Sequence, residues 1–225
     1  MTTTSRPAPP ARVGDRPRTS PQPAAAPTAL SLLVAAGGIH SLYQPIVDLY
    51  SGAILGYEAL ACGPRRHPLA GPAELFAAAR VEGRLAELDR SCHDAAVTGA
   101  RQAGMAEPWT LFVNTEPETA WSAFPAEPGP AVGFPRVIME LTERALTNDP
   151  LQLLQLVARI RRYGWGIALD DVGADPKSLA LLPLLRPDVI KLDLRLVQQQ
   201  PSSDIAAIMS AVNAEAERSG AQVLA

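Results

Sequence analysis

The sequence has few of the residues that build disulfide frameworks, zinc sites or nucleic-acid-binding surfaces. Its 225 residues include two cysteines, Cys62 and Cys92, and three histidines, none of them at the spacing of a known metal motif. Reduced thiols and a cytoplasmic location are the simplest interpretation of this cysteine content. The formal net charge is −3 and the body of the chain has no run of lysine and arginine, which argues against a nucleic-acid duplex as a partner.

No apolar run in the sequence is long enough to be a membrane-spanning segment. The apolar residues 29–39 are too few to cross a bilayer, and we interpret them as an amphipathic helix that packs on the domain. Residues 1–28 are rich in proline and alanine, a composition that buries no core, so we expect a disordered tail there. Hydrophobic residues make up 47% of the chain, and residues 29–225 are expected to form one folded domain.

Apolar runs of strand length alternate with helical patterns along this domain. The first two runs, 42–47 and 53–60, are joined by a short turn containing Ser51-Gly52 and are expected to be antiparallel. The later runs are separated by helices and apolar throughout, as in a parallel sheet buried on both faces. The predicted fold class is α/β, a modified TIM-type (β/α) barrel with an antiparallel opening strand, incomplete at the C-terminus. Further strands are predicted at 110–113, 136–141, 166–169, 188–192 and 221–224, and helices at 84–103, 150–163 and 202–219.

Polar side chains recur where these predicted strands end. Because the carboxyl ends of barrel strands meet at one mouth, we expect the polar groups to converge there. Carboxylate and amide oxygens suit Mg²⁺ or Mn²⁺, and a lysine inside a strand supplies compensating charge. An adjacent acidic pair where strand becomes loop predicts two neighbouring ions. The alternative is that each acidic residue caps the following helix. The residues concerned are Glu58, Asn114, Glu140, Asp170, Asp171 and Lys191.

Several short motifs occur in an order that is typical of one family. They are residues 43–47 (YQPIV), 56–60 (GYEAL), 112–114 (FVN), 140–143 (ELTE), 169–173 (LDDVG) and 187–193 (PDVIKLD). The ordered set resembles the EAL domain family of phosphodiesterases, which hydrolyse the cyclic dinucleotide cyclic-di-GMP to linear pGpG with a divalent metal. Each three-letter match is weak alone, whereas the set covers nearly the whole folded region.

The resemblance implies a role for each matching residue. Glu58, Asn114, Glu140, Asp170 and Asp171 are expected to be metal ligands, with Glu58 and Lys191 as catalytic residues and Lys191 orienting the attacking water. Gln44 and Leu60 are expected to line the nucleotide site, and Glu143 to anchor the loop after Asp171. Since relatives dimerise, a homodimer is a further expectation.

The sequence also departs from the family pattern. Cys62 stands where the family usually has an arginine that contacts the ligand phosphate, and a thiol lacks that bidentate charge. The sequence ends at Ala225, one residue before the position of a further glutamate ligand, so we expect impaired hydrolysis by this chain. Two hypotheses follow: a metal-dependent cyclic-di-GMP phosphodiesterase, or a degenerate EAL domain that binds cyclic-di-GMP or a protein partner without catalysis.

Overall fold

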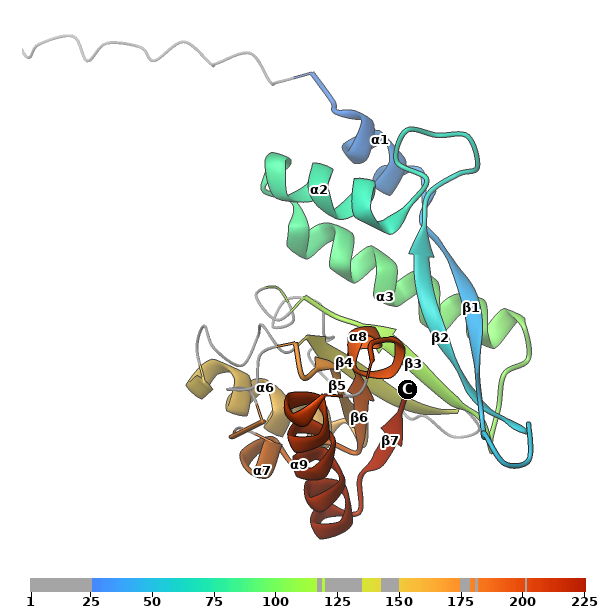
Figure 1. Ribbon diagram of the computed structural model, residues 1–225. Coiled ribbons are helices and arrows are strands. Elements are labelled where there is room, and N and C mark those ends of the chain that lie inside the picture. The colour runs from blue at the N-terminus through green and yellow to red at the C-terminus, as the bar shows by residue number, and fades with distance from the viewer. Residues whose placement is uncertain are drawn as a thin grey trace, which may run out of the picture.

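The computed structural model describes residues 26–116, 119, 135–142, 150–174, 179–180, 182–200 and 202–225. Within these ranges an opening hairpin is followed by strands that alternate with helices (Figure 1). The elements are α1 (Ala29–Ala35), β1 (His40–Val47), β2 (Ile54–Cys62), α2 (Pro72–Glu82), α3 (Leu85–Gln102), β3 (Thr110–Asn114), β4 (Arg136–Thr142), α6 (Pro150–Arg162), β5 (Gly166–Val172), α7 (Leu182–Leu185), β6 (Val189–Leu192), α8 (Leu194–Gln198), α9 (Ser203–Ser219) and β7 (Gln222–Leu224).

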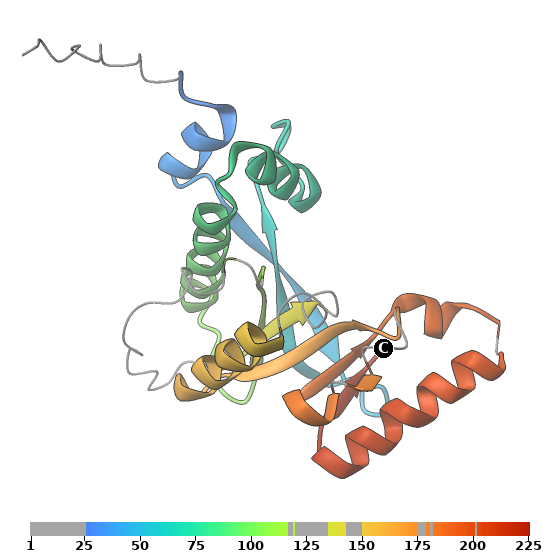
Figure 2. The same cartoon turned by 90° about the vertical axis from the view of Figure 1, so that its left-hand side faces the viewer.

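The strands form one sheet in sequence order, β1-β2-β3-β4-β5-β6-β7. β1 pairs with β2 antiparallel, and each later pair is parallel, as the turn and the helical connections predict. The sheet curls instead of lying flat (Figure 2), so residues of its two edge strands, β1 and β7, line a common groove. This half-barrel confirms the predicted α/β class and its antiparallel opening strand.

Each strand divides its side chains between the outer helices and the inside of the curl. The outer set packs with residues of α3, α6 and α9 in the main core, which includes Leu111, Met139 and Leu169. The inner set forms a smaller apolar layer of Phe112, Ile138, Ala168 and Val189. Side chains two residues apart share a face of a strand. The residues two positions further along these strands also face the inside of the curl, so a polar layer lies next to the apolar one. This polar layer consists of Asn114, Glu140, Asp170 and Lys191.

Most predicted elements agree with the structure to within two or three residues, and two differences have clear causes. The helix α2 was not predicted, because it begins after Gly71 without a side-chain cap. The β1–β2 hairpin also extends further than predicted, because β2 continues to Cys62 and pairs there with β1 alone. Glu58 was predicted at the end of a strand but lies in the middle of β2. What ends next to Glu58 is the parallel pairing of β2 with β3.

The predicted tail, residues 1–28, lies almost entirely outside the described residues and stays a prediction. The segment predicted as an amphipathic helix begins with α1, whose Leu30 and Leu33 are buried against α2 and α3. No helix among the described residues combines the length and the apolar character that a bilayer crossing requires.

Candidate functional site

Five of the predicted site residues meet inside the curl of the sheet. The ammonium of Lys191 on β6 lies 2.8 Å from Glu140 on β4, 3.1 Å from Glu58 on β2 and 3.4 Å from Asp170 on β5. The side-chain amide of Asn114 on β3 donates a hydrogen bond of 3.0 Å to the other carboxylate oxygen of Glu58. The expected convergence of strand-end polar groups is thus observed for these side chains.

The burial of these groups makes their charges matter. Glu140 is 1% exposed, and the side chain of Lys191 is 15% exposed. Three carboxylates against one ammonium leave a formal charge of −2 when all are ionised. Neither carboxylate oxygen of Glu140 receives a well-directed hydrogen bond from the described residues, although Lys191 is close enough for an ion pair. Such an unsatisfied buried carboxylate is costly unless another cation or a proton joins it.

The ionisation of the cluster follows from burial and from Lys191. Burial raises the pKa of Glu140 to about 8; Lys191 opposes this rise and the nearby Glu58 adds to it. Burial alone would lower the pKa of Lys191, but Glu140, Asp170 and Glu58 outweigh it and hold that pKa well above its ordinary value. The lysine is therefore a fixed cation. One ammonium interacts with three carboxyl groups, so its attraction does not offset the burial of Glu140, the most buried of the three.

Glu58 behaves in the opposite way to Glu140. Burial works to raise the pKa of Glu58, but attraction to Lys191 and the hydrogen bonds from Asn114 and Lys191 outweigh burial and lower that pKa. Glu58 is accordingly a carboxylate at neutral pH. Two carboxyl groups that share one lysine thus have pKa values pushed apart by their surroundings, a pattern that recurs at functional sites.

A bulge in β5 explains how two adjacent aspartates avoid the core. The β5–β6 register shifts between Leu169 and Val172, so Asp170 and Asp171 together oppose one residue of β6. Asp171 has a positive φ of 58° and is exposed. The extra residue allows both Leu169 and Val172 to pack in the main core. In a regular strand Asp171 would take the buried outer position that Val172 fills.

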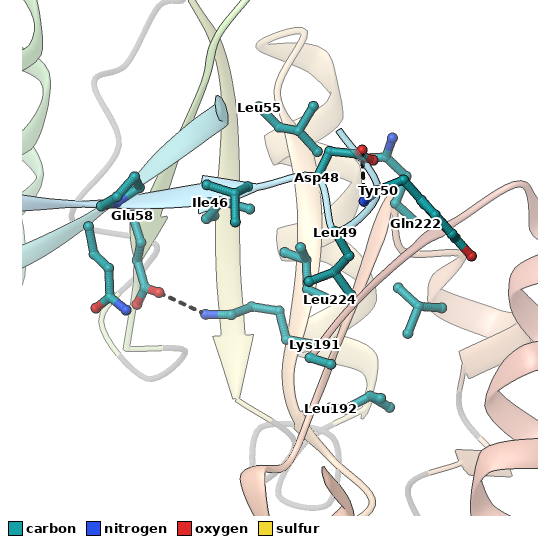
Figure 3. A pocket seen from close by; sticks show the side chains of 15 residues that line it. Ile46, Asp48, Leu49, Tyr50, Leu55, Glu58, Lys191, Leu192, Gln222 and Leu224 are labelled. Atoms are coloured by element: carbon teal, nitrogen blue, oxygen red, sulfur yellow. Dashed lines mark hydrogen bonds and ion pairs between the residues drawn. The ribbon is translucent and has the colours of Figure 1, made fainter. Parts of the chain in front are cut away.

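Two cavities flank Glu58, and each contains one predicted substrate-binding residue. A groove of about 570 Å³ runs between the β1–β2 hairpin and β7 and is lined by Gln44, Glu58 and Lys191 (Figure 3). Its other walls are mainly apolar and include Ile46 and Leu224. A second cavity of about 300 Å³ is lined by Glu58, Leu60 and Asn114. Glu143, the predicted loop anchor, lies outside the described residues.

The donor set fits a divalent ion chemically, although it does not form a ready-made cage. Among the described residues, no three histidine, cysteine, aspartate or glutamate side chains are arranged to hold a metal as they stand. Lys191 lies between the carboxylates instead. The excess charge of −2 and the unsatisfied oxygens of Glu140 are nevertheless what an Mg²⁺ or Mn²⁺ ion would neutralise.

Sequence reasoning missed a polar pair on α3 beneath the site. Asp89 is fully buried and accepts hydrogen bonds from Thr115 and Thr119, and the His93 imidazole lies 3.1 Å from the carbonyl oxygen of Asn114. Their spacing of four residues places both on one helix face. No spacing links them to Asn114, which is 21 residues from His93, so a sequence pattern gives no signal for this contact.

Known proteins resemble this chain in sequence and in fold. The cyclic di-GMP phosphodiesterase RocR of Pseudomonas aeruginosa is 31% identical over 82% of this chain and 49% of its own length. The cyclic di-GMP phosphodiesterase NbdA of the same species is 30% identical over 72% of this chain and 22% of its own. A manganese and cyclic-di-GMP complex of Klebsiella pneumoniae BlrP1 superimposes with a TM-score of 0.69, at 27% identity, covering 83% of this chain and 48% of that one.

The chain therefore spans about half or less of the length of these relatives. The family match extends over the described fold, because the EAL domain profile matches residues 28–225. That range includes every strand of the sheet and every predicted site residue. On this match, with the ordered motifs and the shared half-barrel, the chain belongs to the EAL domain family.

Proposed function

We propose that this chain is the phosphodiesterase domain of a metal-dependent enzyme that hydrolyses cyclic-di-GMP to linear pGpG. The observation that carries the proposal is the buried cluster of three carboxylates around Lys191, with its formal charge of −2. The same substrate class is supported by RocR and NbdA, which are cyclic di-GMP phosphodiesterases, and by the cyclic-di-GMP bound in the BlrP1 complex. The groove beside Glu58 and Lys191 offers about 570 Å³ for a dinucleotide.

The proposed metal ligands are Glu58, Asn114, Glu140, Asp170 and Asp171, with Mg²⁺ or Mn²⁺ as the ion. Oxygen donors favour these hard cations over softer metals. These residues would hold a divalent ion, which would supply a nucleophilic water and positive charge for phosphodiester hydrolysis. Asn114 and Lys191 hold Glu58 from two sides, so its carboxylate is oriented before any ligand arrives.

Lys191 acts in this proposal as a permanent hydrogen-bond donor. Its raised pKa keeps the ammonium charged over the physiological range, so it orients the attacking water and stabilises negative charge that grows on the phosphate. Gln44 lies on β1 opposite Glu58 and lines the groove, and Leu60 lines the cavity on the other side. Both are proposed to contact the nucleotide, while Glu143 is proposed to hold the loop after Asp171.

Cys62 favours a second function, that of a degenerate domain that binds cyclic-di-GMP or a protein partner without catalysis. This residue lies on the same face of β2 as Glu58, four residues further on, where the family usually carries a phosphate-binding arginine. Loss of that charge weakens phosphate binding more than it alters the carboxylate cluster. The expectation of impaired hydrolysis stays a prediction, as do the cytoplasmic location, the homodimer and the lack of affinity for a nucleic-acid duplex.

Incubation of the purified chain with cyclic-di-GMP and Mn²⁺, followed by chromatography of the products, tests the proposal. Because hydrolysis by this chain is expected to be impaired, linear pGpG should form only slowly in the wild type. It should not form at all in Glu140→Gln, which keeps the shape of the side chain but removes a ligand charge. Calorimetric titration with cyclic-di-GMP separates the alternatives. Binding without any product would favour the non-catalytic module, and absence of both would reject the two functions together.

A further inference from the structure

His93 lies beneath the candidate metal centre and contacts the main chain of a predicted ligand. The residue is on α3 and 8% exposed, and its Nε2 is 3.1 Å from the carbonyl oxygen of Asn114. A carbonyl only accepts, so Nε2 carries the proton and donates. The same nitrogen is 3.8 Å from Asp89, which is fully buried.

The contact falls where β2 no longer pairs with β3, although β4 still pairs with Asn114 through Glu140. The β2–β3 pairing ends at Ala59 and Val113, one residue before Asn114. The carbonyl of Asn114 thus lies beyond that ladder, and the imidazole supplies a donor from the helix instead. This part-buried hydrogen bond is a specific tie between α3 and the end of β3.

The end of β3 contacts two of the acidic residues at the site. The side chain of Asn114 donates to Glu58 at 3.0 Å, and the next amide, that of Thr115, donates to the main-chain oxygen of Glu140 at 3.1 Å. Asp89 accepts hydrogen bonds from Thr115 and Thr119, which follow Asn114 in the sequence. A small rotation of the Asn114 peptide would therefore move the amide that orients Glu58.

We propose that His93 is a positioning residue for the candidate metal centre. By holding the Asn114 carbonyl, it fixes the Asn114 amide and, through that amide, the carboxylate of Glu58. The inference deepens the proposed function and rests on it for the metal. If His93 only filled space in the core, replacing it would lower stability and leave metal affinity unchanged. If it positions Glu58, replacing it would also lower metal affinity.

The test compares three variants of the full chain. His93→Leu keeps an apolar side chain of similar reach but removes the donor, whereas His93→Gln retains an N–H close to the Nε2 position. Leu75→Ala, in the separate cluster between α1, α2 and α3, serves as a destabilising control away from the site. Mn²⁺ affinity is measured by electron paramagnetic resonance without substrate. The side-chain amide signal of Asn114 is followed by NMR in metal-free protein, with Asn114→Ala to assign it.

We expect His93→Leu to weaken Mn²⁺ binding about tenfold, the lower end of the effect of losing an outer partner of a metal ligand. Its Asn114 amide signal should shift, while His93→Gln and Leu75→Ala keep the wild-type affinity and signal. Equal Mn²⁺ affinity in His93→Leu and Leu75→Ala would overturn the inference. If the wild type binds no Mn²⁺, the proposed function fails, and an unshifted Asn114 signal in His93→Leu would still refute the positioning role independently.

Discussion

Replacing Glu140 by glutamine should stabilise the metal-free chain above pH 8, even though it removes a predicted metal ligand. Burial raises the pKa of Glu140 from its ordinary 4.5 to about 8. Below pH 4.5 the folded and unfolded chains both hold this proton. Between these two values the unfolded chain releases it while the folded chain retains it, so stability falls as the pH rises. Above pH 8 the folded chain also ionises and the loss is complete.

The size of the effect follows from the same pKa values. At 1.36 kcal/mol per pKa unit, a rise from 4.5 to about 8 corresponds to a loss of about 5 kcal/mol between pH 4 and pH 9. Water that enters the groove beside Lys191 when Glu140 ionises would reduce this, so about 2–5 kcal/mol is expected. Glutamine does not ionise, so Glu140→Gln should escape the loss, which is a large share of the stability of an ordinary domain.

Urea unfolding at pH 5 and pH 9, in the presence of a chelator, measures this difference. The free energy of unfolding of the wild type minus that of Glu140→Gln should become more negative by about 2–4 kcal/mol at the higher pH, because about three pKa units of the rise lie between pH 5 and pH 8. Glu217→Gln, an exposed change on α9, is the matched control and should show the same difference at both values. A wild type that equals or exceeds Glu140→Gln in stability at pH 9 would refute the burial argument, because Lys191 would then fully compensate the carboxylate.

Three further predictions concern single positions. Lys191→Met should lower the rate of pGpG formation by about 100-fold or more, because an electrostatic donor to the reacting phosphate is lost. The affinity for Mn²⁺ should stay equal or rise, and a loss of Mn²⁺ binding would contradict the role given to Lys191. Cys62→Arg should tighten cyclic-di-GMP binding about tenfold in calorimetry, since a guanidinium binds phosphate bidentately; unchanged affinity would mean that this face of β2 does not meet the ligand phosphate. Gly56→Ala should lower the unfolding free energy by about 1–3 kcal/mol in urea, because the added Cβ would collide with the main-chain oxygen of Thr110 on β3; an unchanged midpoint would show that the two strands move apart easily.

The strands and their order were predictable because both faces of the parallel sheet are buried. Continuous apolar runs such as 136–141 and 166–169 leave little choice of structure, and helices between them require parallel pairing. The polar residues at the ends of these runs could then be assigned to one mouth. This step succeeded for Glu140 and Lys191 because strand alternation alone decides that they face the inside of the curl.

What could not be predicted depends on contacts between distant segments or on local irregularities. The bulge at Asp170 and Asp171 is visible only when β5 is aligned with β6, since the two aspartates themselves fit either a strand end or a loop. The tie from His93 to Asn114 joins a helix to a strand that follows a turn of seven residues, 103–109. Neither the bulge nor the His93–Asn114 contact produces a regular spacing of residues in the sequence, so both become visible only in the folded structure.

Lys191 explains how three carboxylates can be gathered inside a sheet before any metal is present. Without its ammonium, Glu58, Glu140 and Asp170 would carry a charge of −3 in a partly buried layer, and mutual repulsion would oppose the curl of the sheet. With it, the remaining charge of −2 matches one divalent ion. Lys191→Met should therefore lower the stability of the metal-free chain at pH 9, whereas Glu140→Gln raises it. In the double variant the two effects should not add, because each change alters the charge that the other residue meets.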